Sequence, residues 1–106
     1  MPPNESLLRR VRDALRDERD VVERKMFGGI TFMVNGRMCV SVGARRLMCR
    51  IDPVIHEAVT KQRACRTVVM KGRAYRGYVH VDESAVRRKN DFEYWIRLAR
   101  EFNAKL

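Results

Sequence analysis

The feature that most restricts the fold of this chain is the alternation of its apolar residues between positions 30 and 51. In the first part of this segment the apolar residues with even numbers are Ile30, Phe32, Val34, Met38, Val40 and Val42. A β-strand turns successive side chains to opposite faces, so these residues share one face only if paired residue numbers have an even sum. A two-residue Asn35-Gly36 turn would give an odd sum. We therefore predict a bulged hairpin with a three-residue loop, in which Gly36 is left-handed.

The same apolar face continues into a third strand after a four-residue connection over positions 43–46. Cross-strand pairs that keep the face apolar fix the register of this strand. The predicted pairs are Val42 with Leu47, Val40 with Cys49, and Met38 with Ile51. Upstream, Gly28 and Gly29 interrupt the extended run 21–34, and glycines inside a strand usually mark a bulge or bend. We expect one bent strand there, and hence a unit of three antiparallel strands.

Three further segments have helical signals. Asn4 can cap an amphipathic helix, and Asp52-Pro53 can begin a short helix that extends to about residue 60. A last helix is expected after a cap at Asn90 or Asp91. The apolar stripe of the first helix is Leu7, Leu8, Val11, Ala14 and Leu15, and that of the last is Phe92, Trp95, Ile96, Ala99, Phe102 and Leu106.

Two short alternating runs, 66–71 and 78–82, predict a second hairpin joined by a loop over 72–77. The order is then helix, three strands, helix, two strands, helix. This order predicts a two-layer α+β fold with a five-stranded antiparallel sheet covered by helices. A length of 106 residues fits one domain over residues 1–106.

The composition favours a cytoplasmic protein without a cofactor. No apolar run approaches the roughly 20 residues of a membrane span, and the amino end has no secretory signal. The three cysteines are too far apart for a metal knuckle or a redox pair, and we expect Cys39 and Cys49 to be buried in strands. Arg63 and Arg66 would favour a thiolate at Cys65. His56 and His80 have no catalytic partner at a recognisable spacing, so we predict no catalytic and no metal site.

The positive charge is concentrated in the middle of the chain. The formal net charge is +10, and residues 1–35, 36–81 and 82–106 contribute +1, +8 and +1. Two arginine pairs are expected in hairpin connections, where they could reach phosphate oxygens. These candidate nucleic-acid-binding residues are Arg45, Arg46, Arg73 and Arg76. The same arginines could equally be a solvated face, because the 18 Arg and 5 Lys of the chain can reflect codon usage.

Several segments of the chain, taken in order, resemble the TfoX N-terminal domain family over nearly its full length. They are VERKMFGGITFMV within 22–34, Asn35-Gly36 followed by Met38, residues 47–50, and MKGRAYRGYVHVD over 70–82. The most specific part is Met26, Phe27, Gly28 and Gly29, followed at the expected distance by Gly72 and Gly77. Glycine pairs, Asn35-Gly36, Gly72 and Gly77 also have architectural explanations in bends and turns.

The resemblance implies a helix, three strands, a helix, two strands and a helix in two layers, and no enzymatic activity or cofactor. The family includes bacterial regulators of natural competence, which are thought to act on transcription together with a cyclic-AMP receptor protein. Those regulators carry a second, helical domain at the carboxyl end, whereas this sequence ends at Leu106 directly after its last predicted helix. We therefore expect the function of the first domain only.

Three functions compete at this point. The first is a non-enzymatic regulatory domain that contacts a protein partner through a face or edge of the sheet. The second is a basic domain that binds nucleic acid through segment 36–81, mainly by electrostatic attraction. The third is an enzyme that uses Cys65, Asp52 or Glu57, and it would require Cys65 to lie within hydrogen-bond distance of His56 or His80.

Overall fold

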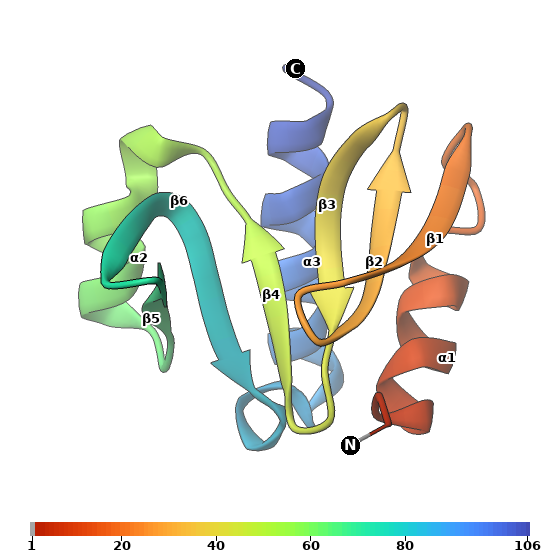
Figure 1. Cartoon of the computed structure of the whole chain (residues 1–106), viewed down its shortest axis with the longest axis horizontal. Coiled ribbons are helices and arrows are strands. Elements are labelled where there is room, and N and C mark those ends of the chain that lie inside the picture. The colour runs from red at the N-terminus through yellow and green to blue at the C-terminus, as the bar shows by residue number, and fades with distance from the viewer. Residues whose placement is uncertain (1) are drawn as a thin grey trace.

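The computed structural model describes residues 2–106, which form three helices and one six-stranded sheet (Figure 1). All neighbouring strands are antiparallel, in the order β1-β2-β3-β4-β6-β5. The predicted α+β class is therefore confirmed. The elements in chain order are α1 (Glu5–Ala14), β1 (Val21–Met26), β2 (Gly29–Val34), β3 (Arg37–Val42), β4 (Arg46–Arg50), the 3-10 helix η1 (Pro53–Ile55), α2 (His56–Gln62), β5 (Arg66–Met70), β6 (Arg73–Asp82), the 3-10 helix η2 (Glu83–Val86) and α3 (Lys89–Asn103).

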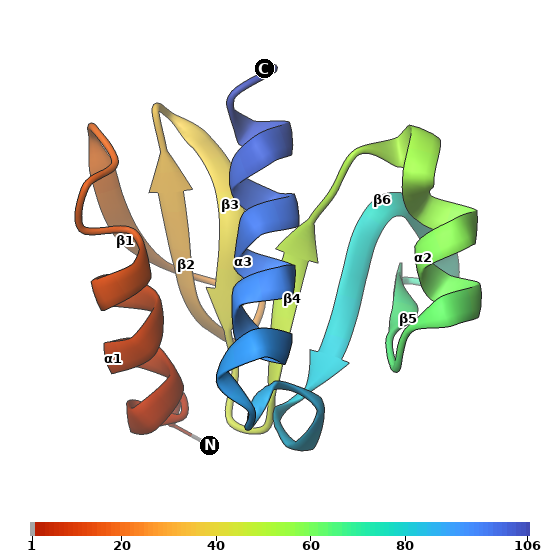
Figure 2. The same ribbon diagram turned by 180° about the vertical axis from the view of Figure 1, so that it is seen from behind.

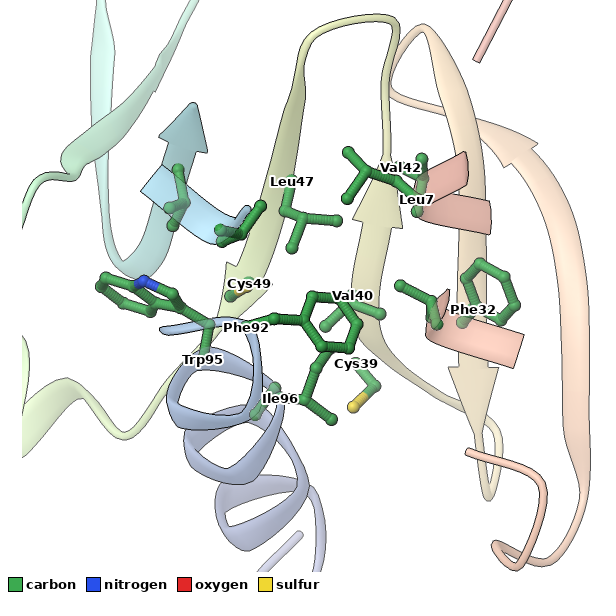
Figure 3. Close-up of a cluster of buried hydrophobic side chains, with 14 of the residues drawn as sticks. Leu7, Phe32, Cys39, Val40, Val42, Leu47, Cys49, Phe92, Trp95 and Ile96 are labelled. Atoms are coloured by element: carbon green, nitrogen blue, oxygen red, sulfur yellow. The ribbon is translucent and has the colours of Figure 1, made fainter. Parts of the chain in front are cut away.

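Helices α1 and α3 cover one face of the sheet, while α2 lies beside β5 and β6 (Figure 2). The main core fills the space between α1, α3 and this face, and α3 packs on β3 and β4 (Figure 3). Its fully buried strand residues include Phe32, Val40, Leu47 and Cys49. At the far end of α3, the buried Asn103 amide donates a hydrogen bond of 3.2 Å to the Val34 carbonyl on β2. None of the helices within residues 2–106 is long and apolar enough to span a membrane.

The register of the three central strands follows the predicted parity over most of its length. Phe32 pairs with Val40, both side chains are fully buried, and the pairs Val42–Leu47 and Val40–Cys49 form as predicted. The turn between β2 and β3, however, contains only Asn35 and Gly36. Both have positive φ (53° and 79°), as a type I′ hairpin turn requires.

The bulge of this hairpin lies within β3, not in its turn. Val40 pairs with Phe32 and Met38 with Met33, so Cys39 is the extra residue. Met38 therefore packs on the opposite face, with Met33 and Met48, and the predicted pairing of Met38 with Ile51 is wrong. A two-residue Asn-Gly turn matches the strand twist, and the bulge restores the even register beyond it.

The bent strand expected over 21–34 is in fact two strands. β1 ends at Met26, the chain reverses through Phe27 and Gly28, and β2 begins at Gly29. Phe27 and Gly28 both have positive φ (57° and 74°). The sheet therefore has six strands instead of five. The glycine pair suggested only a bend because a bulky residue such as Phe rarely adopts positive φ.

The second hairpin is also tighter than predicted. Its turn consists of Lys71 and Gly72 (φ 53° and 73°), so the expected loop over 72–77 belongs mostly to β6. β6 then contains a wide irregularity, because Thr67 pairs with Val79 whereas Val68 pairs with Tyr75.

The predicted caps at Asn4 and Asp52 are confirmed, although Asp52 caps the 3-10 helix η1 that leads into α2, and α2 itself has no side-chain cap. The Asn4 side chain accepts a hydrogen bond of 3.0 Å from the Leu7 amide, and Asp52 accepts one of 3.0 Å from the Val54 amide. The predicted cap of the last helix is wrong. α3 begins after Arg88 with no side-chain cap, and Asn90 and Asp91 lie inside its first turn, where the Asp91 charge complements the helix dipole.

Candidate functional site

The face of the sheet turned away from α1 and α3, called here the second face, carries a separate apolar cluster. Alternation along β4 and β6 places Met48 and Tyr78 on this face, opposite to the core residues Cys49 and Val79. The cluster consists of Met38, Met48 and Val68, with Met33, Met70, Tyr75 and Tyr78 packed around it. The three central residues are themselves buried, so the cluster is a small second core, and only the residues packed around it are partly exposed.

The two outer hairpins curl toward each other over the second face. β1 and β5 are the opposite edges of the sheet, yet the β1–β2 turn contributes Phe27 to a pocket whose other residues come from the β5–β6 hairpin. In Figure 1 this turn crosses in front of β3. The pocket has a volume of about 210 Å³. We call it the aromatic pocket; its lining is Phe27, Met70, Tyr75 and Tyr78.

Phe27 is held in an unfavourable backbone conformation to reach this place. A positive φ costs a bulky residue of the order of 1–3 kcal/mol, and such strain clusters at binding and catalytic sites. The side chain is not buried in return, because 41% of Phe27 remains exposed. Beside it, Tyr75 and Tyr78 meet edge to face, with ring centroids 6.4 Å apart, and the Arg50 guanidinium lies 5.4 Å from the Tyr78 ring.

The glycines of the family motif serve the hairpins. Gly28, Gly36 and Gly72 each occupy the second position of a two-residue turn with positive φ. Gly29 serves a different purpose, because a Cβ atom there would lie 2.1 Å from the Val42 carbonyl oxygen of β3. Gly77, at φ 92°, packs against Pro53 and hydrogen-bonds with Ile51.

The four arginines predicted to bind nucleic acid do not converge on one place. Arg45 and Arg46 lie at the start of β4, where Arg46 pairs with Asp82 at the end of β6. Arg73 begins β6, so the ten residues of that strand separate the two groups. Arg76 is already engaged by Glu57 of α2, with Nη2 to Oε1 at 2.9 Å and Nε to Oε2 at 3.0 Å.

A second pocket lies at the β4–β6–β5 end of the sheet, with a volume of about 290 Å³. We call it the arginine pocket; its lining is Arg46, Ala64, Cys65, Arg66, His80 and Asp82. Only Arg46 of this set was predicted to bind a ligand. Arg66 and His80 were missed because their proximity depends on the register of three strands that are distant in sequence.

A larger hollow lies elsewhere, along α3, with a volume of about 570 Å³. Its lining mixes Asp91 and Glu93 with Arg97 and other basic side chains, so it has no field of one sign. Its two aromatic rings are each covered by a guanidinium, Phe92 by Arg10 at 4.1 Å and Tyr94 by Arg63 at 4.0 Å. This hollow offers no defined ligand chemistry.

His56 is a structural residue. It is buried, its Nδ1 accepts a hydrogen bond of 3.0 Å from the Gly77 amide, and its Nε2 lies 2.7 Å from the Thr67 hydroxyl. Since Nδ1 is an acceptor, the proton of the neutral ring is on Nε2, which donates to Thr67. His56 therefore ties α2 to both strands of the second hairpin.

The cysteines are not activated. Cys39 and Cys49 are buried as predicted, and burial raises the pKa of Cys39 to about 12 and raises the pKa of Cys49 as well. Partial burial also raises the pKa of Cys65, so the structure does not favour the thiolate that Arg63 and Arg66 suggested. The reason is that burial removes water from the thiol and so disfavours its charged form.

The three residues considered as catalytic candidates, Cys65, Asp52 and Glu57, each contact another group of the protein. The Cys65 thiol lies 3.9 Å from the Val59 carbonyl oxygen, and within residues 2–106 it forms no hydrogen bond to either histidine. Asp52 contacts Lys105 at 3.0 Å, and Glu57 is paired with Arg76. In the part of the chain that the structure describes, no three His, Cys, Asp or Glu side chains are grouped so that they could hold a metal ion.

Comparison with known families finds a match to the model of the TfoX N-terminal domain over residues 13–103. This range includes all six strands, α2 and α3. No curated protein and no solved structure matches the chain.

Proposed function

Since this chain belongs to the TfoX N-terminal domain family, we propose that it is a cytoplasmic, non-enzymatic interaction domain that binds a protein partner on the second face. The family resemblance connects this role to regulatory complexes that act on transcription. The described residues that could perform catalysis are engaged in structural contacts, which also favours binding over chemistry.

The observation that carries the proposal is the position of Phe27. Phe27 lies in a turn with a strained backbone conformation. Its ring lines the aromatic pocket, and 41% of the residue is exposed. Partly exposed aromatic side chains around a small apolar hollow are typical of interaction hot spots. Such a hollow fits one apolar anchor side chain of a partner.

The charge of the domain specifies the chemistry of that partner. The formal net charge is +10, and the Arg50 guanidinium lies between the rings of Tyr78, which lines the aromatic pocket, and Phe102. An acidic segment would be attracted to this surface and would be oriented on it. We therefore expect an acidic protein segment with one aliphatic or aromatic side chain that enters the aromatic pocket.

The test uses the purified domain as bait in a native lysate treated with nuclease, with Phe27→Asn as the test variant. Asn tolerates positive φ, so this substitution removes the ring and keeps the turn. Val54→Asn is the matched control, because Val54 is 82% exposed and lies in η1, outside the aromatic pocket. We expect one protein to be retained by wild type and Val54→Asn, and its retention to fall at least tenfold with Phe27→Asn.

Equal retention by all three proteins would contradict the use of the aromatic pocket. The alternative, nucleic-acid binding through segment 36–81, is favoured by the +8 charge of that segment alone. Under it, nuclease would release the bound material, and binding to a short DNA duplex would weaken steeply with salt. The distance of Arg45 and Arg46 from Arg73 along β6, and the Arg76–Glu57 ion pair, favour the protein partner.

A further inference from the structure

The arginine pocket brings together two guanidinium groups that form no direct ion pair within the described chain. Arg66 on β5 lies directly opposite His80 on β6, and Arg46 on β4 lies opposite Asp82, diagonal to His80. Side chains in such positions on one face are neighbours. In residues 2–106 neither Arg46 nor Arg66 forms an ion pair within 4.0 Å.

Asp82 is the acidic residue of the lining, but its carboxylate is directed to η2. Its Oδ2 accepts hydrogen bonds from the Ser84 amide at 3.0 Å and from the Ser84 hydroxyl at 2.7 Å. These bonds, with the charges of Arg66 and Arg87, lower the pKa of Asp82. The acid is therefore ionised and fixed, while both guanidinium groups remain available to a ligand.

His80 completes the set as a neutral donor. Its Nδ1 is buried and has no hydrogen-bond partner in the described chain. Burial, with the charges of Arg46 and Arg66, lowers the pKa of His80 to about 4, so the ring is neutral at pH 7. A buried N–H without an acceptor is costly, which favours the proton on Nε2, at the tip of the ring.

We propose that the arginine pocket binds the phosphate group of a small phosphate monoester, with Arg46 and Arg66 as the charged donors and His80 Nε2 as a third donor. Guanidinium forks match the oxygens of phosphate, and two of them suit a dianion better than a monovalent carboxylate. A volume of about 290 Å³ is at the lower end for ligand pockets, so the ligand is small. This site shares no lining residue with the aromatic pocket, but the two are neighbours, because Phe27, Arg46 and His80 together line a small hollow between them. The phosphate proposal does not depend on the proposed protein partner.

The test is a titration of the ¹⁵N-labelled full chain with inorganic phosphate at pH 7, with the ionic strength held constant by NaCl. Chemical shifts of the amides of Cys65, Arg66 and His80 report the pocket. We expect a saturable change in these amides and a weaker one elsewhere. The double variant Arg46→Gln/Arg66→Gln should reduce the affinity at least tenfold, because each charge-assisted hydrogen bond to phosphate is strong.

Arg73→Gln is the matched control, since Arg73 is an exposed arginine of β6 outside the pocket, and it should bind phosphate like the wild type. A second readout follows the imidazole resonances of His80 with pH. A bound anion offsets the charges of Arg46 and Arg66, so phosphate should raise the pKa of His80 more than NaCl at equal ionic strength. The dispersion of each variant's spectrum reports whether it is folded.

Three results would overturn the proposal. One is a change in amide chemical shift that is linear in phosphate concentration, affects many arginines, and is equally large when NaCl is added instead. Another is unchanged affinity in the Arg46→Gln/Arg66→Gln variant. The third is a pocket that responds to a short DNA duplex, with loss in the same variant, but not to inorganic phosphate, which would assign it to nucleic-acid backbone. The phosphate titration does not use the protein partner, so its result can be interpreted whether or not Phe27→Asn abolishes partner binding.

Discussion

Gly28 and Gly29 are neighbours in the chain but are required for different reasons. Gly28 supplies a positive φ of 74° in the β1–β2 turn, and a Cβ atom there would meet nothing within 4 Å. At Gly29 the obstacle is steric, since a Cβ atom would lie 2.1 Å from the backbone oxygen of Val42. The sequence drew attention to both glycines, but only the pairing of β2 with β3 distinguishes their roles.

Alanine substitutions should separate these two reasons. We expect Gly28→Ala to lower the free energy of unfolding by about 1 kcal/mol, the cost of a left-handed backbone for a residue with Cβ. Gly29→Ala should lower it by about 3 kcal/mol or more, because the β2–β3 pairing must be displaced. Urea unfolding of the two variants measures the difference, and equal losses would contradict the assigned roles.

His80 should give the stability a pH dependence of defined sign. Its pKa is lowered from the usual 6.5 to about 4 in the folded protein. Between these two pH values His80 is therefore mostly protonated in the unfolded chain and mostly neutral in the folded protein. The contribution of neutral His80 to the free energy of unfolding is therefore fully present above pH 6.5, and it is lost as the pH falls toward about 4.

Unfolding in urea between pH 7 and pH 5 measures this loss. His80→Gln should flatten the dependence in that range. The carboxylates with lowered pKa, such as Glu23 and Asp82, titrate from ordinary values of 4.5 or below, and so lose their contribution at lower pH. The same slope in His80→Gln and wild type would show that another group is responsible.

At the scale of elements, the hairpins show how far the sequence can be interpreted. The parity of Ile30, Phe32, Val40 and Val42 was sufficient to predict which face of the central strands is buried, because a slip of one residue would expose it. It did not locate the bulge, which lies at Cys39 and not in the turn. The β1–β2 hairpin was not predictable in the same way, since Phe27 breaks the rule that type I′ turns contain Gly, Asn or Asp. The broken rule points to function at Phe27 because this residue also lines a pocket.

Lys71 breaks the same rule in the β5–β6 turn, at φ 53°. Unlike Phe27, it lines neither pocket. Lys71→Asn should therefore stabilise the protein by about 0.5–1 kcal/mol, because Asn tolerates this conformation and Asn-Gly favours the turn. Urea unfolding measures the gain. Lys71→Ala is the control, since it removes the same charge without this tolerance and should give no gain.

At the scale of the whole molecule, the excess positive charge acts across the entire domain. The principal extents are 31 × 30 × 30 Å, close to the Debye length of about 30 Å at 0.01 M salt. The ion pairs of the described residues all involve exposed side chains, such as Arg16 with Asp13, and contribute little. Repulsion among the basic residues should therefore dominate the response to salt.

We expect the Tm to rise by several degrees between 0.01 M and 0.15 M NaCl, where the Debye length shortens to about 8 Å. Differential scanning calorimetry measures this change. Arg37→Gln/Arg73→Gln, which lowers the formal charge from +10 to +8, should show a smaller rise. A Tm that is constant or falls with salt would mean that the ion pairs outweigh the repulsion.

The two pockets could not have been predicted from single residues or single hairpins. Phe27 meets Tyr75 because the opposite edges of the sheet curl toward each other, and Arg46 nears Arg66 because β6 lies between β4 and β5. Both depend on the pairing of β4 with β6, which no local pattern specifies. Of the residues that line the two pockets, the sequence singled out only Arg46 as a ligand residue and Phe27 as a motif residue.

The strand order has a consequence for how the chain reaches its native state. Every neighbouring pair in the sheet is a hairpin of consecutive strands except β4–β6, which must form across the intervening α2 and β5. Isolated hairpins form within about 1–10 μs, whereas contacts between distant segments must first overcome the entropy of loop closure. We therefore expect docking of the β5–β6 arm onto the β1–β4 meander to be the slow step of folding, and both pockets to form only when it is complete.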